Sequence, residues 1–282
     1  MHRAISTHVF LRERLQPAML DAMLAAGAQG IEIFAARHHF DYCDRSQVRE
    51  ISNWFRSNPV EFNSIHQPLY LETEWGRSTG PTVNLIDPHK PRRIEAMDEV
   101  KRALEVAEIV PLLSAVIHLG SRGDAWDTRA LENSMTAIEH LKAFASPLGV
   151  KLNLENIPNE VTEPEHLMEV LRAGHFDTVG VCLDAGHANF RSGVAATFDI
   201  LKDRIHALHL HDNHGEKDEH LWPGSGSVDW QWLMREVAEL KQPITGVLEI
   251  AHSPEETADA VKKKTAAAFA MLEGASAPET ER

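Results

Sequence analysis

Residues 150–187 read VKLNLENIPNEVTEPEHLMEVLRAGHFDTVGVCLDAGH, and this stretch decides the fold. It opens with a short apolar run and continues as an amphipathic segment that begins near Pro164 and stops at Gly174. It closes with a second apolar run. Proline is favoured in the first turn of a helix, and glycine just beyond its end. The order strand, helix, strand predicts a right-handed βαβ unit, in which the two strands are parallel.

The same alternation runs through the whole chain. Strands are expected at residues 4–10, 30–35, 61–67, 115–121, 150–157, 179–185, 205–212 and 244–250. Amphipathic helices are expected at residues 17–27, 46–57, 92–109, 128–146, 163–174, 193–203, 229–241 and 253–273. Eight strands that are each followed by a helix predict a single α/β domain, a (β/α)8 TIM barrel, over residues 1–274, with a polar tail at 275–282. The alternative is a doubly wound open sheet, which is disfavoured because no GxGxxG motif follows the first strand.

Two connections are longer than a barrel requires. One spans residues 68–90, after the third strand, and the other spans residues 213–228, after the seventh. Long loops at the carboxyl end of a barrel commonly shape the active site. We therefore expect both connections to border the functional site.

Composition limits the class of protein. The chain has 282 residues, 43% of them hydrophobic, and its 28 Lys+Arg against 42 Asp+Glu give a net charge of −14. Such a balance opposes binding to nucleic acid and to anionic lipid. The two cysteines, Cys43 and Cys182, lie in unrelated segments and suggest no disulfide framework, and no apolar run approaches the ~18 residues of a membrane span. With no signal-like pattern at the start, a cytoplasmic protein that acts on a small molecule is expected.

Metal-ligand side chains stand at the ends of the predicted strands. Six apolar runs each end on a carboxylate or an imidazole, and the residues are His66, His118, Glu155, Asp184 with His187, His209 with His211, and Glu249. Because the carboxyl ends of parallel strands meet at one mouth of a barrel, these side chains are expected to gather there.

Side-chain alternation supports this expectation. Residues two apart share a face of a strand, so Glu155 shares its face with Asn153 and lies opposite Leu154. On the other strands, the same parity places each candidate on the face opposite its bulky aliphatic neighbours. These candidates are Asp184, His209, His211, Glu249 and His118. Glu32 also faces inward by parity, and we interpret it as a structural partner inside the barrel.

Clustered carboxylates repel one another unless a cation neutralises them. Imidazoles beside carboxylates suit Zn²⁺, Mn²⁺ or Co²⁺ better than an all-oxygen Mg²⁺ site. The alternative is a buried salt-bridge network with structural histidines, but no Lys or Arg stands at these strand ends. The sequence therefore predicts a divalent-metal site.

The chain resembles the xylose isomerase-like TIM-barrel superfamily, which includes sugar phosphate isomerases and epimerases and endonuclease IV. The phrases that carry the resemblance are SIHQPL, VIHLGS, LENIPN, CLDAGHANF, LHLHDN, DEHLWPGSGSVDW and LEI. By resemblance to the epimerases, one metal is held by Glu155, Asp184, His209 and Glu249. His209 is preferred because the family form is His-x-x-Asp, here ending at Asp212, and His211 remains open as a rival because it shares the same parity.

Endonuclease IV holds additional ligands for a trinuclear zinc cluster, and the resemblance supplies counterparts for each of them. These are the residues of a second-metal or substrate-binding set, His66, His118, His187, Asp218 and His220, to which His211 is added as an open candidate. One to three ions are therefore expected.

The leading hypothesis is a metal-dependent isomerase or epimerase of a sugar or a sugar-like polyol or keto compound, in which Glu155 and Glu249 transfer the proton. The main alternative is a multinuclear zinc phosphodiesterase of the endonuclease IV type. A third hypothesis is a non-catalytic sugar-binding barrel, which the intact ligand set disfavours. Nucleic acid and membrane are not expected as partners, and the sequence is compatible with a homo-oligomer.

Overall fold

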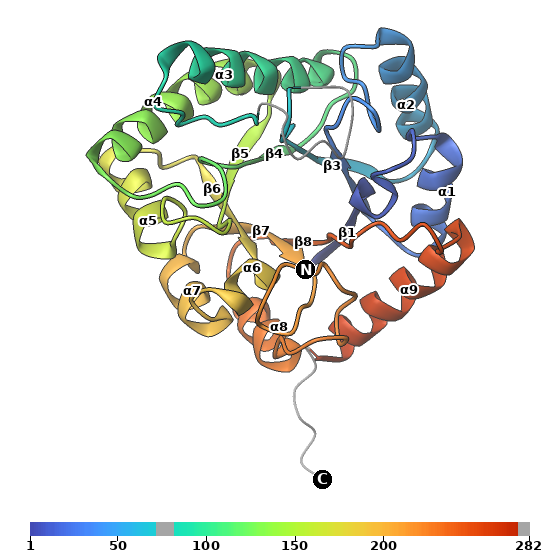
Figure 1. Cartoon of the computed structure of the whole chain (residues 1–282). Coiled ribbons are helices and arrows are strands. Elements are labelled where there is room, and N and C mark those ends of the chain that lie inside the picture. Colours follow the sequence, from blue (N-terminus) through green and yellow to red (C-terminus); the bar gives the residue numbers. More distant parts are fainter. Residues whose placement is uncertain (72–81, 276–282) are drawn as a thin grey trace.

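The computed structural model describes residues 1–71 and 82–275. Eight parallel strands form a closed barrel in which each strand pairs with the next along the chain and the eighth pairs with the first (Figure 1). The strands are β1 (His2–Ser6), β2 (Gly30–Phe34), β3 (Glu61–His66), β4 (Ser114–Ile117), β5 (Lys151–Glu155), β6 (Gly180–Asp184), β7 (Ile205–Leu210) and β8 (Thr245–Leu248). The predicted (β/α)8 barrel is confirmed.

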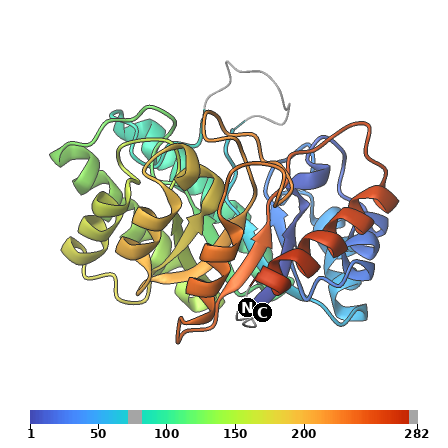
Figure 2. The ribbon, with the colours of Figure 1, turned by 90° about the horizontal axis from the view of Figure 1, so that it is seen from below.

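Helices surround the barrel on its outside (Figures 1 and 2). The α-helices are α1 (Pro17–Ala25), α2 (Arg45–Ser57), α3 (Lys90–Leu104), α4 (Thr128–Ala145), α5 (Pro164–Ala173), α6 (Ala185–Phe190), α7 (Val194–Leu201), α8 (Trp230–Ala238) and α9 (Ala258–Ala275). Three short 3-10 helices accompany them, η1 (Thr7–Phe10), η2 (Glu105–Glu108) and η3 (Ser146–Leu148). Residues 72–81 of the first long connection lie outside the described part, and so do the tail residues 276–282.

The hydrophobic residues form two separate clusters. The large one contains the aliphatic side chains that alternate outward along the strands, such as Ile33, Leu154 and Leu183, together with the inner faces of the helices. The small one, Val116, Cys182 and Ala207, shares the face that carries the polar candidates. The parity argument is therefore confirmed: bulky aliphatics pack against the helices, and small or polar side chains fill the barrel.

Several predicted boundaries are wrong, among them those of the first strand and of the last helix. The first strand was expected at residues 4–10, but β1 ends at Ser6, whose hydroxyl accepts a hydrogen bond from the His8 backbone amide and caps η1. The last helix was expected from Ser253, but α9 begins only at Ala258. The serine cap ends β1 within an apolar run, and a turn at Pro254 delays the start of α9.

A helix that the sequence did not predict, α6, follows β6 directly. Its N-cap is Asp184, whose Oδ1 accepts a hydrogen bond from the His187 backbone amide at 2.6 Å. Helix caps of this kind satisfy a free amide in the first turn. The cap therefore places His187 beside the end of β6.

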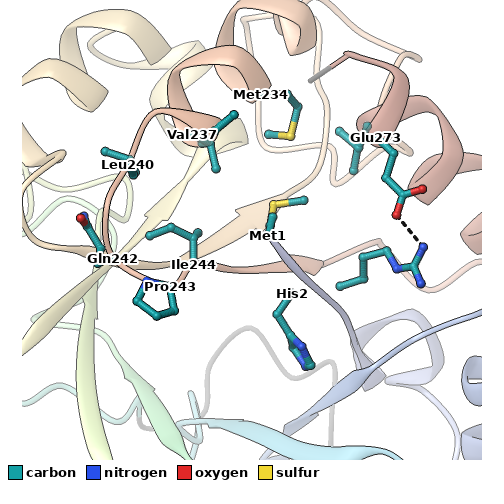
Figure 3. A pocket seen from close by; sticks show the side chains of 12 residues that line it. Met1, His2, Met234, Val237, Leu240, Gln242, Pro243, Ile244 and Glu273 are labelled. Carbon is teal, nitrogen blue, oxygen red and sulfur yellow. Dashed lines mark hydrogen bonds and ion pairs between the residues drawn. The ribbon is translucent and has the colours of Figure 1, made fainter. Parts of the chain in front are cut away.

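A cavity lies at the end of the barrel where the strands begin (Figure 3). It has a volume of about 430 Å³ and lies between the start of β1, the start of β8, α8 and α9. Arg3 and Glu273 form an ion pair at its edge. The metal-type residues stand at the opposite ends of the strands, so this cavity is not part of their site. No helix in the described part of the chain is long and apolar enough to cross a membrane.

Candidate metal centre

The barrel brings all of the predicted ligand residues together at the carboxyl ends of the strands. They form three groups within which the ligand atoms lie no more than 4.8 Å apart. The main group is Glu155, Asp184, His209 and Glu249; the His118 group is His66, His118 and Glu155; the loop group is His187, His211, Asp218 and His220. Glu155 belongs to two groups, so the main and His118 groups are adjacent.

The main group is deeply buried, since none of its residues is more than 3% exposed. Its imidazole lies between the carboxylates: His209 Nδ1 is 3.4 Å from Glu155 Oε2, 3.3 Å from Glu249 Oε2 and 3.7 Å from Asp184 Oδ2. His209 is paired with Asp184 on the neighbouring strand, whereas His211 lies beyond the end of β7. The structure thus places His209 in the main group and His211 in the loop group.

Two neighbours fix the geometry of the main group. The other ring nitrogen of His209, Nε2, is 3.3 Å from Glu32 Oε2, and Glu32 also accepts a hydrogen bond from the Ser64 hydroxyl. Glu32 therefore orients His209 from inside the barrel, in line with the structural role predicted for it. Asn156 forms hydrogen bonds with both the backbone amide and the carbonyl of Asp184. Sequence analysis missed Asn156, for which the only signal was its place next to Glu155.

The His118 group extends the site towards β3 and β4. His118 Nε2 is 2.9 Å from Glu155 Oε2 and 3.1 Å from His66 Nε2. His66 Nδ1 lies 2.9 Å from the Gln67 carbonyl, so in the neutral ring Nδ1 donates to this carbonyl and Nε2 carries the lone pair. Two imidazole nitrogens and a carboxylate oxygen therefore converge on one point.

The loop group joins α6 and the end of β7 to the connection between β7 and α8. His187 Nε2 is 3.2 Å from Asp218 Oδ2, and His220 Nε2 is 3.1 Å from Asp218 Oδ1. His187 Nδ1 lies 3.2 Å from Glu155 Oε1, which makes the loop group continuous with the rest of the centre.

Electrostatics keeps the acidic ligands ionised. Burial alone would raise the pKa of Glu155, but the charges of His118 and His209 outweigh burial and lower this pKa well below its ordinary value. Burial would also raise the pKa of Asp184, but the charges of His187 and His211 outweigh burial and lower this pKa. None of the Lys or Arg ion pairs among the described residues involves a carboxylate of the three groups. Within the described part of the chain, the negative charge of the centre is therefore met by imidazoles alone.

Several ligand atoms lack the partners that buried polar atoms normally have. His209 Nδ1, His187 Nδ1, His211 Nδ1 and Asp218 Oδ1 are buried without a hydrogen-bond partner in the described part of the chain. Buried polar atoms without a partner are rare in proteins and call for an explanation. A bound divalent cation would satisfy these atoms, so the donor set fits a metal.

A cavity of about 420 Å³ opens beside the His118 and loop groups. His118, His187 and Asp218 line it on one side, and its other walls include Tyr70, Arg122 and Pro158. A volume of this size suits a small-molecule ligand. This cavity, hereafter the mouth cavity, provides space for a small molecule next to the His118 and loop groups.

A family model described as "Xylose isomerase-like TIM barrel" matches residues 20–271. The chain belongs to this family. The resemblance inferred from the sequence motifs is therefore confirmed.

Individual relatives are more distant. The chain is 30% identical over 179 residues to the uncharacterized protein MJ1311 of Methanocaldococcus jannaschii, in a match that covers 59% of this chain and 58% of the relative. It is 27% identical over 174 residues to a protein named "Probable endonuclease 4" of Natronomonas pharaonis, which covers 55% of this chain and 61% of the relative. The chain thus spans less than two thirds of the length of these curated relatives.

Solved structures share the fold over nearly the whole chain. A D-tagatose 3-epimerase-like protein superposes with a TM-score of 0.76 at 21% identity, covering 98% of this chain and 97% of that one. The IolI protein with a bound zinc atom superposes with a TM-score of 0.78 at 17% identity, covering 96% of this chain and 98% of that one.

Proposed function

We propose that this protein is a divalent-metal-dependent isomerase or epimerase of a small sugar or of a sugar-like polyol or keto compound. The observation that carries the proposal is the main group, in which three buried carboxylates and one imidazole bring their ligand atoms within 4.8 Å of one another. The adjoining mouth cavity of about 420 Å³ suits a small molecule. Membership of the xylose isomerase-like family and the epimerase-like structural neighbour support the same reaction class.

Glu155, Asp184, His209 and Glu249 would hold the ion. Zn²⁺, Mn²⁺ and Co²⁺ suit this mixture of imidazole and carboxylate. A divalent ion supplies Lewis-acid polarisation of a carbonyl oxygen, which acidifies the hydrogen on the neighbouring carbon.

The two glutamates are the groups that would move the proton. Glu155 extends from the end of β5 and Glu249 follows β8, so their carboxylates approach the centre from different sides of the barrel. One carboxylate oxygen would take the proton from the carbon next to the carbonyl, and the other would return it. In an epimerase the two transfers occur on opposite faces of that carbon, which requires two such groups.

A metal-assisted hydride shift is a weaker candidate mechanism. The end of β5 reads LNLENIP and carries no lysine, and Lys151 stands at the exposed start of that strand, away from the mouth. Proton transfer by carboxylates therefore accounts better for the residues that are present.

A second candidate function is a multinuclear zinc phosphodiesterase of the endonuclease IV type. It is favoured by the two further ligand groups beside the main group and by the relative named "Probable endonuclease 4". The net charge of −14 weighs against a DNA substrate. Arg122 is the only Lys or Arg among the described residues that line the mouth cavity.

The test replaces Glu249 by Gln, which keeps the shape of the side chain and one potential ligand oxygen. The protein, loaded with Mn²⁺, Co²⁺ or Zn²⁺, is incubated in D2O with a panel of keto sugars, and deuterium incorporation is measured by mass spectrometry. We expect Glu249→Gln to retain metal and to lose turnover, together with exchange on the face that Glu249 serves, by ~10²–10⁴-fold, the usual contribution of a general acid or base. The control is Glu216→Gln, at an exposed position in the connection after β7, which should behave as the parent. Turnover that persists at the parental rate in Glu249→Gln would remove Glu249 from the proton path; exchange alone does not decide this, because Glu155 could still exchange the proton on its own face.

A further inference from the structure

The cavity at the end of the barrel where the strands begin, hereafter the floor cavity, lies away from the ligand groups and the mouth cavity. Its volume of about 430 Å³ falls within the range of small-molecule pockets. Its walls come from β1, from α8 and the connection that leads into β8, and from the end of α9. A ligand in this cavity would therefore contact the first strand and the last helix together.

Most side chains of the wall are apolar. Met234 and Val237 on α8 face Met1 and Ile244 across the cavity (Figure 3). Leu272 adds to the same wall from α9. Methionine side chains are flexible and polarisable, so they adapt to ligands of different shape. The wall therefore suits a flexible apolar chain.

Two of the polar side chains that line the cavity already have partners. Gln242 Nε2 donates hydrogen bonds to the carbonyls of Lys202 and Ile205. The His2 ring points away from the apolar wall, and its Nε2 lies 3.3 Å from Glu61 Oε2. The other polar side chains of the lining are the ion pair between Arg3 and Glu273.

Arg3 has unused hydrogen-bond donors. Its Nη1 donates a hydrogen bond to Glu273 Oε1, and within the described residues the guanidinium makes no other. A guanidinium carries five N–H donors in a plane that matches a carboxylate.

The ion pair with Glu273 is weak enough to be shared. The Arg3 side chain is 30% exposed and that of Glu273 is 58% exposed, and exposed ion pairs contribute little to stability. A second carboxylate can therefore share the guanidinium or replace Glu273 at small cost. Arg3 is also the only Lys or Arg among the described residues that line the floor cavity.

We propose that the floor cavity binds an amphipathic monocarboxylate, in which Arg3 holds the carboxylate and the wall of α8, α9 and the strand starts holds an alkyl chain. This site goes beyond the proposed function, because it lies at the opposite ends of the strands from the candidate metal centre. It does not depend on which reaction that centre supports.

The experiment titrates the full chain with octanoate, octylamine and octanol by isothermal calorimetry, with and without bound metal, and repeats the titration with hexanoate. Arg3→Met removes the guanidinium and keeps an unbranched side chain. Its control is Arg129→Met, at an exposed position on α4. Ala238→Phe fills part of the floor cavity from an exposed position on α8, and Ala267→Phe, exposed on α9 outside the lining, is its control.

We expect octanoate to bind the parent and both controls, whether or not metal is bound. Arg3→Met should weaken this binding ~10–100-fold, the contribution of hydrogen bonds to a charged group. Ala238→Phe should also weaken it, with an unchanged unfolding temperature as evidence that the variant folds. Hexanoate should bind more weakly by about fourfold for each methylene that it lacks, because each buried methylene adds that much to affinity. Octylamine and octanol should bind about tenfold more weakly than octanoate, or less.

Three results would overturn the proposal. The first is the absence of octanoate binding to the parent. The second is equal binding of the three head groups, which would mean that Arg3 does not select an anion. The third is parental affinity in both Arg3→Met and Ala238→Phe, which would place the ligand elsewhere, as would binding that requires the metal. None of these measurements uses turnover, so the isomerase proposal can fail while this one holds.

Discussion

Asp184 has several roles in the centre. Its carboxylate caps α6, contacts His211 and lies in the main group, and Asn156 fixes its backbone from β5. One side chain thus connects the end of β6, the start of α6 and both neighbouring ligand groups. A substitution of Asp184 should therefore first reduce the affinity of the main group for metal.

We predict that Asp184→Asn lowers metal affinity at the main group by more than the ~10–100-fold that is typical for residues that only orient ligands. The amide keeps the size of the side chain but removes the charge that attracts the cation. Metal content after equilibrium dialysis gives the answer, with Asp199→Asn on the surface of α7 as the control. Parental metal content in a folded Asp184→Asn variant would exclude Asp184 as a ligand.

His39 gives a prediction for stability against pH. It is fully buried, and burial lowers its pKa from 6.5 to about 4, although its Nδ1 donates a hydrogen bond to the Glu13 carbonyl. Because the folded pKa is the lower one, the unfolded chain takes up the proton first as pH falls. The contribution of neutral His39 to the free energy of unfolding is therefore complete above about pH 6.5. It is lost as the pH falls towards 4, by up to ~3 kcal/mol.

Urea unfolding of metal-free protein between pH 4 and 7 measures this effect. His39→Gln should show a shallower loss of stability in that window than the parent, and His140→Gln, at an exposed position on α4, should follow the parent. The prediction would be refuted if the free energy of unfolding fell equally steeply with decreasing pH in the parent and in His39→Gln.

Parity on a strand could tell which side chains face the barrel axis, but it could not separate His209 from His211. The two residues share a face, and the choice depends on depth along the axis. His209 lies beside Asp184 within the sheet, while His211 lies beyond the strand and contacts the loop. Such depth follows from strand register, which a single sequence does not contain.

The connection between β7 and α8 is the element on which the loop group depends. Asp212, at its start, accepts hydrogen bonds from the backbone amides of Gly224 and Val228 and from Trp230 Nε1. A buried carboxylate that receives several donors fixes a loop strongly. Asp212 therefore has an organising role in this connection.

We predict that Asp212→Ala costs about 2–3 kcal/mol of stability, because it leaves buried donors without an acceptor. Hydrogen exchange should rise at residues 221–229, and thermal unfolding should occur at a lower temperature. Asp203→Ala, at an exposed position in the turn before β7, serves as the control. Unchanged exchange in that segment would mean that other contacts hold the connection.

At the scale of elements, long amphipathic helices and apolar strands could be predicted because their periodicity extends over many residues. Short elements could not. The six residues of α6 are too few to show a period, and η1 is capped by a serine within an apolar run. The start of α9 was misplaced for a different reason, since Ser253 and Pro254 resemble a helix start but lie at a turn.

The whole molecule is a closed barrel, and closure of the barrel brings the residues of the candidate metal centre together. Residues as far apart in the sequence as His66 and Glu249 meet because β8 pairs with β1. Counting eight βα units was enough to predict closure. The division of the additional residues between the His118 group and the loop group could not be foreseen, because it depends on distances between strands.

Net charge is a property of the whole molecule and argues against a DNA substrate. With a charge of −14, we predict weak, salt-sensitive or absent binding of duplex DNA that contains an abasic site. Fluorescence anisotropy at several salt concentrations measures it. Tight binding near physiological salt, with incision at the abasic site, would reverse the order of the two candidate functions.

The most direct test of the account is metal-dependent exchange of solvent deuterium into a panel of keto sugars, followed by mass spectrometry. The reloaded parent should exchange the hydrogen next to the carbonyl of at least one sugar, and both the chelator-stripped protein and Asp184→Asn should not. Exchange that is independent of metal and of Asp184, or incision of abasic DNA by a protein that exchanges none of the sugars, would contradict a metal-dependent isomerase or epimerase.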